Sequence, residues 1–383
     1  MRSLKPTALA LATLSIFAAG PARAQSLEQM AGQMIVVGFS GTSASAKTVT
    51  ALRAEIAAGL LGGVMYLKTN VSSLKAVREM NAAFRSASPA MPPFLTLDQE
   101  GGAVERLTEE VGFREIPSAQ AVAAGNAPAA AEAIYARMAR GIADVGFSVN
   151  FGPVVDLSTN PRNQVIAKYG RAFSADAQTV ATYAAAFVEG HREAGVLTAL
   201  KHFPGHGSST ADSHEGFVDI TRSWDKSELE PYRALIGAGA VDLVMVGHLY
   251  HADYSGADAQ LPSSLSPAWV TGVLRGELGF DGVVISDDLE MGAIREHFSM
   301  RDTILMSVRA GVDVLLFSNT VKPRASLTDE IRAILVAEAE ADPAFAAQIK
   351  RSYERIVALK KRIGGGSIAA LEAPVPMERP DGL

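Results

Sequence analysis

The residues best suited to chemistry gather between positions 201 and 214, where three of the seven histidines of this 383-residue chain lie. The segment reads Lys-His-Phe-Pro-Gly-His-Gly at 201–207 and Asp-Ser-His at 212–214. Asp212 and His214 are close enough in sequence to hydrogen-bond in a turn, so the carboxylate can orient the imidazole for proton transfer. A turn hydrogen bond made by a loop aspartate is the plainer alternative.

A metal site is a second interpretation of the same segment. His202 and His206 are four residues apart, the spacing that places two imidazoles on one face of a helix around zinc. A proline and two glycines within the same seven residues disfavour such a helix. We therefore expect a strand end followed by a Gly-rich loop, with no metal and no other cofactor. A metal-dependent hydrolase that uses His202, His206 and Asp212, and a structural role for buried histidines, remain as alternatives.

Two adjacent carboxylates, Asp287 and Asp288, follow the apolar run Val-Val-Ile-Ser at 283–286. Side chains of a strand alternate between its two faces, so at most one of the pair points to the mouth of a barrel. Asp287 directly ends the strand and is the stronger candidate for chemistry. Asp288 is better placed to cap the helix that follows.

A third group of polar residues surrounds Asp98, which ends another apolar run. Glu100 and a Gly-Gly pair follow it, and there the backbone can approach a ligand closely. A buried carboxylate in such a place can accept two sugar hydroxyls at once. Arg106 and Arg171 supply matching donors, although each arginine, taken alone, is better explained as a surface residue or a structural ion pair.

The elements that must position these residues are eight short runs rich in Val, Ile and Leu, which alternate with alanine-rich segments of helical spacing. The predicted strands span 34–39, 62–67, 94–97, 148–155, 197–202, 243–248, 282–286 and 312–317; the clearest predicted helices span 127–145, 176–194, 226–237, 267–277, 291–310, 327–340 and 344–362. This alternation predicts an α/β fold, a single (β/α)8 TIM-type barrel with room for irregular first strands and with a C-terminal helix. A doubly wound sheet would give the same alternation. Polar residues at the ends of several different strands favour the barrel.

The two ends of the chain differ from its body. Two basic residues precede an apolar run at 8–19, and Ala-Arg-Ala follows at 22–24, which predicts a secretory signal peptide over residues 1–24. The run is shorter than the roughly 20 residues that span a bilayer, so we expect an exported protein, periplasmic or secreted, without a membrane span. Residues 25–366 then form one domain, and residues 367–383, with three prolines, form a loose tail.

Composition excludes several classes of function. The formal net charge of −6 argues against a nucleic-acid partner. Because the chain has no cysteine, disulfides, thiolate metal sites and cysteine nucleophiles are excluded. Nothing in the sequence predicts an oligomer, so we expect a monomer.

Taken together, the motifs resemble in order and spacing the β-N-acetylglucosaminidases of glycoside hydrolase family 3, in particular their bacterial single-domain branch that acts in cell-wall recycling. The similarity runs from about residue 33 to about residue 318 and includes Asp-Gln-Glu-Gly-Gly at 98–102 and Ser-Asp-Asp-Leu-Glu-Met at 286–291. It implies a retaining mechanism with a covalent intermediate on Asp287, and an acid/base histidine, His214, paired with Asp212. By the same resemblance, polar side chains bind the N-acetylglucosamine ring: Asp98, Arg106, Arg171, Lys201, His202 and His248.

The resemblance also implies a substrate, terminal β-linked N-acetylglucosamine on peptidoglycan fragments (muropeptides) or chitooligosaccharides. We expect Gly205 and Gly207, which flank His206, to let the loop open and close, so that His214 reaches the leaving oxygen only when substrate is bound.

Two departures from the family pattern stand out. Many relatives carry an arginine after the Gly-Gly pair, where this chain has Ala103. Relatives of this branch are also often cytoplasmic, which disagrees with the predicted signal peptide.

Three alternatives to an N-acetylglucosaminidase remain: a phosphorylase of the same family, a β-glucosidase, and a periplasmic sugar-binding protein without catalysis.

Overall fold

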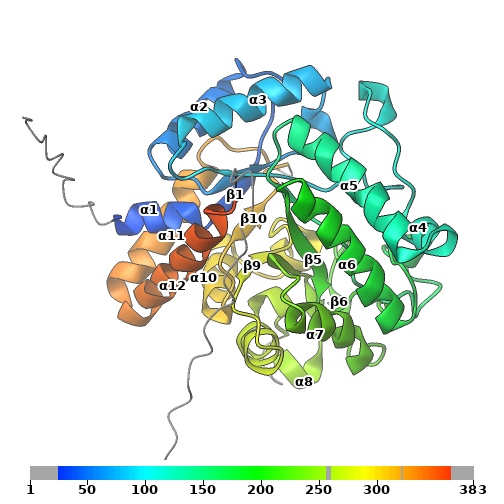
Figure 1. Ribbon diagram of the computed structural model, residues 1–383. Helices are drawn as coiled ribbons and strands as arrows, with labels where there is room; N and C mark the ends of the chain where they lie inside the picture. Colours follow the sequence, from blue (N-terminus) through cyan, green and yellow to red (C-terminus); the bar gives the residue numbers. More distant parts are fainter. Residues whose placement is uncertain (1–24, 256–259, 321, 364–383) are drawn as a thin grey trace, which may run out of the picture.

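The computed structural model describes residues 25–255, 260–320 and 322–363, and its centre is one sheet of eight parallel strands (Figure 1). Along the sheet the strands follow the order β10-β1-β2-β3-β4-β5-β7-β9. They are β1 (Ile35–Gly38), β2 (Gly63–Met65), β3 (Phe94–Leu97), β4 (Val149–Asn150), β5 (Leu197–Phe203), β7 (Leu243–Val246), β9 (Val283–Ser286) and β10 (Leu315–Phe317). The end strands β9 and β10 also meet, through a parallel bridge between Ile285 and Val314. The sheet therefore closes into the predicted (β/α)8 barrel.

All eight predicted strands are present, with bounds that differ by a few residues. The first strands, for which the sequence allowed an irregular path, run in regular parallel register: Val36 lies beside Gly63 of β2 and Leu316 of β10. The shortest strand of the barrel is β4, with two residues, and the chain after it pairs again with β5 through Val154 and Lys201. Every residue of β1, β3, β7 and β9 is buried, as expected for parallel strands covered on both faces.

Helices surround the barrel (Figure 1). They are α1 (Leu27–Gln33), α2 (Lys47–Ala57), α3 (Leu74–Ala87), α4 (Ala119–Gly125), α5 (Pro128–Asp144), α6 (Ala177–Glu193), α7 (Glu230–Gly237), α8 (Ala252–Ser255), the π-helix η6 (Ala268–Glu277), α9 (Gly292–Arg295), α10 (Met300–Ala310), α11 (Leu327–Ala341) and α12 (Pro343–Lys360). A small second sheet pairs β6 (Val218–Asp219) with β8 (Leu249–Tyr250).

Two predicted helices are interrupted. The helix expected over 291–310 is two helices, α9 and α10, because the Ser299 hydroxyl accepts a hydrogen bond from Asp302 N at 3.1 Å and so caps a new helix start. The helix expected over 226–237 begins as a 3₁₀ turn, η4 (Lys226–Leu229), after Asp225 has capped it by accepting from Ser227 N at 2.8 Å. The first of these breaks matters for the site, since α9 directly follows the strand end that carries Asp287.

Two predictions concern the ends of the chain, and a third concerns a membrane span. The predicted signal peptide (1–24) and the predicted tail (367–383) lie outside the described residues. Over residues 25–255, 260–320 and 322–363, no helix has both the length and the apolar character that crossing a membrane requires.

Lys360, at the end of α12, is buried at the N-terminal end of the barrel. Its ammonium donates to Gln33 Oε1 and to the Gly62 carbonyl, each at 2.7 Å, and lies 4.7 Å from the centre of the Phe94 ring. No carboxylate of the described residues forms a salt bridge with it. Burial lowers the pKa of Lys360 to about 7.

This buried amine predicts a pH-dependent stability. Because the folded-state pKa lies below the value of about 10.4 in an unfolded chain, the unfolded chain binds the extra proton between about pH 7 and pH 10, and the free energy of unfolding rises with pH across that window. Over this range we expect the free energy of unfolding of the unmodified protein to rise by about 2–4 kcal/mol more than that of Lys360→Met. Urea unfolding at both pH values measures the gain, and the same pH dependence in both proteins would contradict the prediction.

Candidate active site

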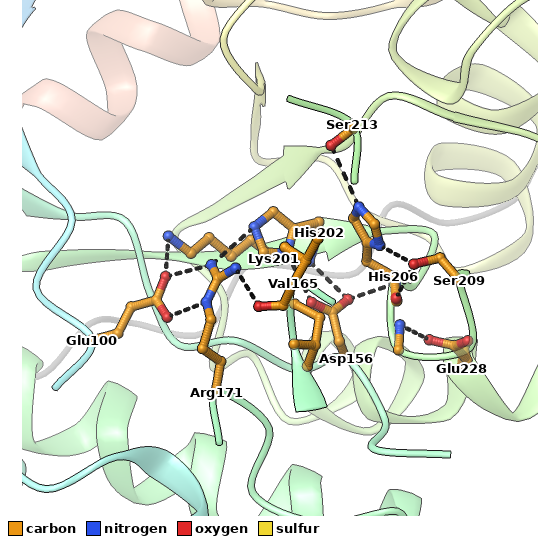
Figure 2. A network of polar contacts seen from close by, with 12 residues as sticks. Glu100, Asp156, Val165, Arg171, Lys201, His202, His206, Ser209, Ser213 and Glu228 are labelled. Carbon is orange, nitrogen blue, oxygen red and sulfur yellow. Dashed lines mark hydrogen bonds and ion pairs between the residues drawn. The ribbon is translucent and has the colours of Figure 1, made fainter. Parts of the chain in front are cut away.

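The C-terminal ends of β3 and β5 carry a buried network of opposite charges (Figure 2). The Lys201 ammonium lies 2.7 Å from Asp98 Oδ1 and 2.7 Å from Glu100 Oε1. Burial alone would lower the pKa of Lys201, but the two carboxylates outweigh it and raise that pKa above its ordinary value. Lys201 therefore stays charged, with two of its three donors used by the protein and a third left for a ligand.

Two arginines complete the network. Arg171 forms a bidentate pair with Glu100, with both N–O distances 2.8 Å, and Arg106 Nη2 lies 2.9 Å from Asp98 Oδ2. Burial alone would raise the pKa of both carboxyl groups, yet the neighbouring cations lower it below the ordinary value. The result is a fixed array of charged donors and acceptors that can bind the hydroxyls of a sugar.

Buried amides hold the loop that carries Arg106. Gln99 Oε1 accepts from the backbone N–H groups of Arg106 and Leu107, each at 2.9 Å. Asn150, at the end of β4, binds the backbone of Gln99 from the other side, accepting from its N–H at 2.9 Å and donating to its carbonyl at 2.8 Å. Asp98 and Glu100, which flank Gln99, are thereby fixed relative to β4.

His202 is linked to the array through Asp156, which lies in the chain after β4. The His202 Nδ1–H donates to Asp156 Oδ2 at 2.7 Å, and its Nε2 faces the Arg171 guanidinium at 3.5 Å. The other oxygen of Asp156 accepts from the backbone N–H groups of His202 (3.1 Å) and His206 (2.8 Å). Burial alone would raise the pKa of Asp156, but the histidines and these N–H groups lower it, so Asp156 is ionised.

Asp287 lies where β9 ends, and its backbone N–H donates to the Val246 carbonyl of β7 at 2.9 Å. Its Oδ1 accepts from Asp288 N at 2.8 Å. Burial alone would raise the pKa of Asp287, but the imidazoles of His202, His248 and His214 outweigh it and lower that pKa to about 2. Asp287 is therefore a half-buried carboxylate that is ionised at neutral pH, as a nucleophile must be.

Asp288 turns away from Asp287, as the alternation of a strand predicts, but it does not cap the next helix. Its Oδ1 accepts from Glu290 N at 3.1 Å and from Ser318 N at 2.9 Å. The helix starts later, at Gly292 after Met291. Asp288 thus ties the end of β9 to the chain beyond β10.

His248 supports the same strand end. Its Nε2–H donates to the Asp288 carbonyl at 2.9 Å, and its Nδ1 pairs with the Ser264 hydroxyl at 2.8 Å. Both ring nitrogens are thus engaged by protein groups, and burial lowers the pKa of His248, so the ring is neutral. Its contact with a sugar stays a prediction.

Asp212 and His214 do form the hydrogen bond that their spacing allows, with Nδ1 of the imidazole 2.7 Å from Asp212 Oδ1. Two-thirds of the His214 side chain is exposed. Because Nδ1–H is held by Asp212, the free nitrogen Nε2 is the one that can exchange a proton with a ligand. The loop reaches the start of α9, where Ala293 N donates to the Ser213 carbonyl at 3.1 Å and Gly292 N to the His214 carbonyl at 3.3 Å.

Gly205 and Gly207 lie in a tightly packed part of the loop, and their action as a hinge stays a prediction. A Cβ on Gly207 would lie 1.6 Å from the Leu157 carbonyl oxygen, and one on Gly205 would lie 2.5 Å from Glu228. The Glu228 carboxylate accepts from the backbone N–H groups of Gly207 and Ser208, each at 3.0 Å. The glycines are needed for close packing.

Three acids of the site were assigned no role from the sequence: Glu100, Asp156 and Glu228. Glu100 and Asp156 stand at or just beyond strand ends, a signal that was visible but shared with many other residues. No sequence pattern singles out Glu228, because it lies on η4 and its partners are loop amides. Among the described residues, no group of three or more His, Asp and Glu side chains has the arrangement of a metal site.

A closed barrel whose C-terminal mouth holds an ionised carboxylate beside paired acids and bases has the architecture of a TIM-barrel glycoside hydrolase. The chain belongs to glycosyl hydrolase family 3, because a model described as "Glycosyl hydrolase family 3 N terminal domain" matches residues 26–359. It is therefore a glycoside hydrolase.

Individual relatives agree with this assignment. The chain is 37% identical over 292 residues to a beta-hexosaminidase of Stenotrophomonas maltophilia (strain R551-3), which covers 74% of this chain and 82% of the relative. A solved family 3 beta-N-acetylglucosaminidase from Paenibacillus sp. str. FPU-7 has a TM-score of 0.80 at 30% identity, over 93% of this chain and 66% of that chain. A beta-N-acetylhexosaminidase from Beutenbergia cavernae DSM 12333 has a TM-score of 0.77 at 32% identity, over 88% of this chain and 99% of that one.

Proposed function

We propose that this glycoside hydrolase is a retaining exo-β-N-acetylglucosaminidase, or more broadly a β-N-acetylhexosaminidase. The observation that carries the proposal is the pairing of an ionised carboxylate, Asp287, at the end of β9 with an Asp212–His214 hydrogen bond on a loop docked against α9. The choice of N-acetylglucosamine as the sugar is supported by the beta-hexosaminidase and the beta-N-acetylglucosaminidase to which this chain is similar.

In the first half of the proposed reaction, a carboxylate oxygen of Asp287 attacks the anomeric carbon while His214 Nε2–H donates its proton to the glycosidic oxygen. The carbon–oxygen bond to the leaving group breaks, the alcohol departs, and a glycosyl ester forms on Asp287. In the second half, Nε2 takes a proton from water, the water oxygen bonds to the anomeric carbon, and the ester bond breaks. Two inversions leave the sugar with its original β configuration.

The charges of the site suit these roles. Asp287 is ionised because its pKa is about 2, so it can act as a nucleophile without losing a proton first. Asp212 holds Nδ1–H of His214 and stabilises the imidazolium that must form before the leaving oxygen is protonated. We assign recognition of the sugar ring to the buried array at β3 and β5: Asp98, Arg106, Arg171, Lys201 and His202, with Glu100 holding two of the cations.

We further propose that the enzyme is exported and acts on terminal β-linked N-acetylglucosamine of peptidoglycan fragments or chitooligosaccharides. The support is the signal-peptide pattern of residues 1–24 and the choice of sugar above. A neutral imidazole repels an incoming anion less than a second carboxylate would, so phosphate in place of water is an outcome that the test must separate.

The test compares p-nitrophenyl glycosides of β-N-acetylglucosamine and β-glucose, with and without phosphate and EDTA. We expect EDTA-resistant cleavage with kcat/KM at least about 10²-fold higher for the N-acetyl sugar, because a site built for a polar substituent rejects an analogue that lacks it. Free N-acetylglucosamine as the product would support hydrolysis, and the sugar 1-phosphate would point to a phosphorylase. Preference for glucose, or no turnover of either glycoside, would refute the proposed activity.

A further inference from the structure

Ser213 differs from its two neighbours in the direction of its side chain. The side chains of Asp212 and His214 are 26% and 66% exposed, whereas Ser213 is only 2% exposed. The proton-transfer pair therefore faces the solvent side of the loop, and the residue between its members points into the protein.

The Ser213 hydroxyl points toward the ring of His206, as Figure 2 shows, with Oγ 3.4 Å from His206 Nε2. On the other side of the ring, His206 Nδ1 lies 2.6 Å from Ser209 Oγ, and Ser209 Oγ also lies 2.9 Å from the His206 carbonyl oxygen. If the Ser209 hydroxyl donates to the carbonyl, Nδ1 of His206 carries the proton and Nε2 accepts from Ser213; in the other tautomer Nε2–H donates to the Ser213 hydroxyl. In either tautomer the contact between Ser213 Oγ and His206 Nε2 joins the loop to this ring.

His206 is suited to a fixed, neutral role. Burial, helped by the nearby His202 imidazole, lowers the pKa of His206 to about 4. Its backbone is held as firmly as its ring, because its N–H donates to Asp156 at 2.8 Å and its carbonyl accepts from Asn163 Nδ2 at 2.8 Å. His206 thus offers Ser213 a rigid partner.

The backbone of the same loop is held from the opposite direction by α9. The carbonyls of Ser213 and His214 accept from Ala293 N and Gly292 N. A Cβ on Gly292 would lie 2.8 Å from the His214 carbonyl oxygen, so the approach requires glycine. Because α9 begins five residues after Asp287, these bonds fix the loop relative to the proposed nucleophile.

We propose that Ser213 and His206 are positioning residues that dock the Asp212–His214 pair beside Asp287. The proposal rests on the proposed function, since it assigns them to the proton-transfer steps of that reaction. Neither side chain takes part in those steps. Asp156 joins this contact to the sugar site, because one carboxylate binds both His202 and His206.

The test uses Ser213→Ala on two aryl N-acetyl-β-glucosaminides. A phenyl leaving group needs protonation to depart, whereas a 2,4-dinitrophenyl group does not. We expect kcat/KM to fall by about 10–100-fold for the phenyl glycoside and by less than about threefold for the dinitrophenyl glycoside, because misplacing a general acid affects only leaving groups that need one. With the dinitrophenyl glycoside, kcat should fall even though kcat/KM is nearly unchanged, because hydrolysis of the glycosyl ester needs His214 as a base. Azide needs no base, so it should restore kcat and give the β-glycosyl azide.

Two further variants make the result interpretable. Ser307→Ala is the matched control: Ser307 on α10 is also buried, its hydroxyl has no hydrogen-bond partner among the residues that the structure describes, and we expect unchanged kinetics with both glycosides. Gly292→Ala disturbs the docked loop from the side of α9 and should reproduce the leaving-group dependence of Ser213→Ala even if that variant folds poorly.

The inference is overturned if Ser213→Ala and Gly292→Ala lose activity equally on both glycosides, or lose none. Equal loss would mean a general effect on folding or on the sugar site. Inactivity of the unmodified protein on every β-N-acetylglucosaminide would instead remove the proposed function itself, which is a different result.

Discussion

Replacing Asp287 with asparagine is expected to lower kcat on an aryl N-acetyl-β-glucosaminide by roughly 10⁴-fold or more, because the amide keeps the shape of the side chain but cannot form the glycosyl ester. The folded structure should tolerate the change. Oδ1 already accepts from Asp288 N, and an amide oxygen can do the same. Thermal unfolding should therefore shift by no more than about 2–4 °C, the equivalent of roughly 1 kcal/mol in a chain of this size.

The measurement pairs kcat with mass spectrometry. A fluorinated substrate that slows the second step should leave a covalent sugar on the peptide containing Asp287 in the unmodified protein and none in the variant. Asp281→Asn is the control, since this exposed aspartate lies just before the opposite end of β9. Retention of a tenth of kcat in Asp287→Asn, or label on another residue, would rule out Asp287 as the nucleophile.

Replacing Lys201 with methionine is expected to damage both stability and substrate binding. The change leaves Asp98 and Glu100 with one arginine each and with no cation between them. Removing one partner of a buried ion pair lowers the free energy of unfolding by about 3–5 kcal/mol, and we expect a loss at the low end of that range because the two arginines remain. According to the proposed function, the bound sugar also loses a charged hydrogen-bond donor. We therefore expect kcat/KM to fall roughly 10²–10³-fold with a raised KM.

Urea unfolding and steady-state kinetics on the same preparations separate the two effects. Lys75→Met on α3 changes a lysine that is 85% exposed, and neither quantity should move. If Lys201→Met unfolds like the control and keeps its KM, the charged array is not the sugar site.

The elements of the barrel could be predicted because their signals are local. Each strand is a short apolar run between polar segments, and the eight runs recur in alternation with helical spacing, so their number and order follow from the sequence. Where prediction failed, a single capping side chain decided the outcome: Ser299 starts a new helix inside a segment whose apolar pattern continues.

The candidate site could be predicted in part for a related reason. Strand ends in a barrel converge on one mouth, so Asp98, Lys201 and Asp287 were expected at the same end of the barrel although they lie far apart in the chain. The hydrogen bond between Asp212 and His214 spans two residues and is nearly a property of the turn itself.

What the sequence by itself determined was therefore the barrel, the positions of its strands and the polar residues at their ends, because these depend on periodicity and short spacing. Only the tertiary structure decided which charges pair: Glu100 with Arg171, 71 residues away, and Asp156 with His202, 46 residues away. It also decided that Gly205 and Gly207 serve packing, and that Ser213 turns inward. Such outcomes depend on the distance and direction of side chains brought together by packing, and no local pattern encodes them.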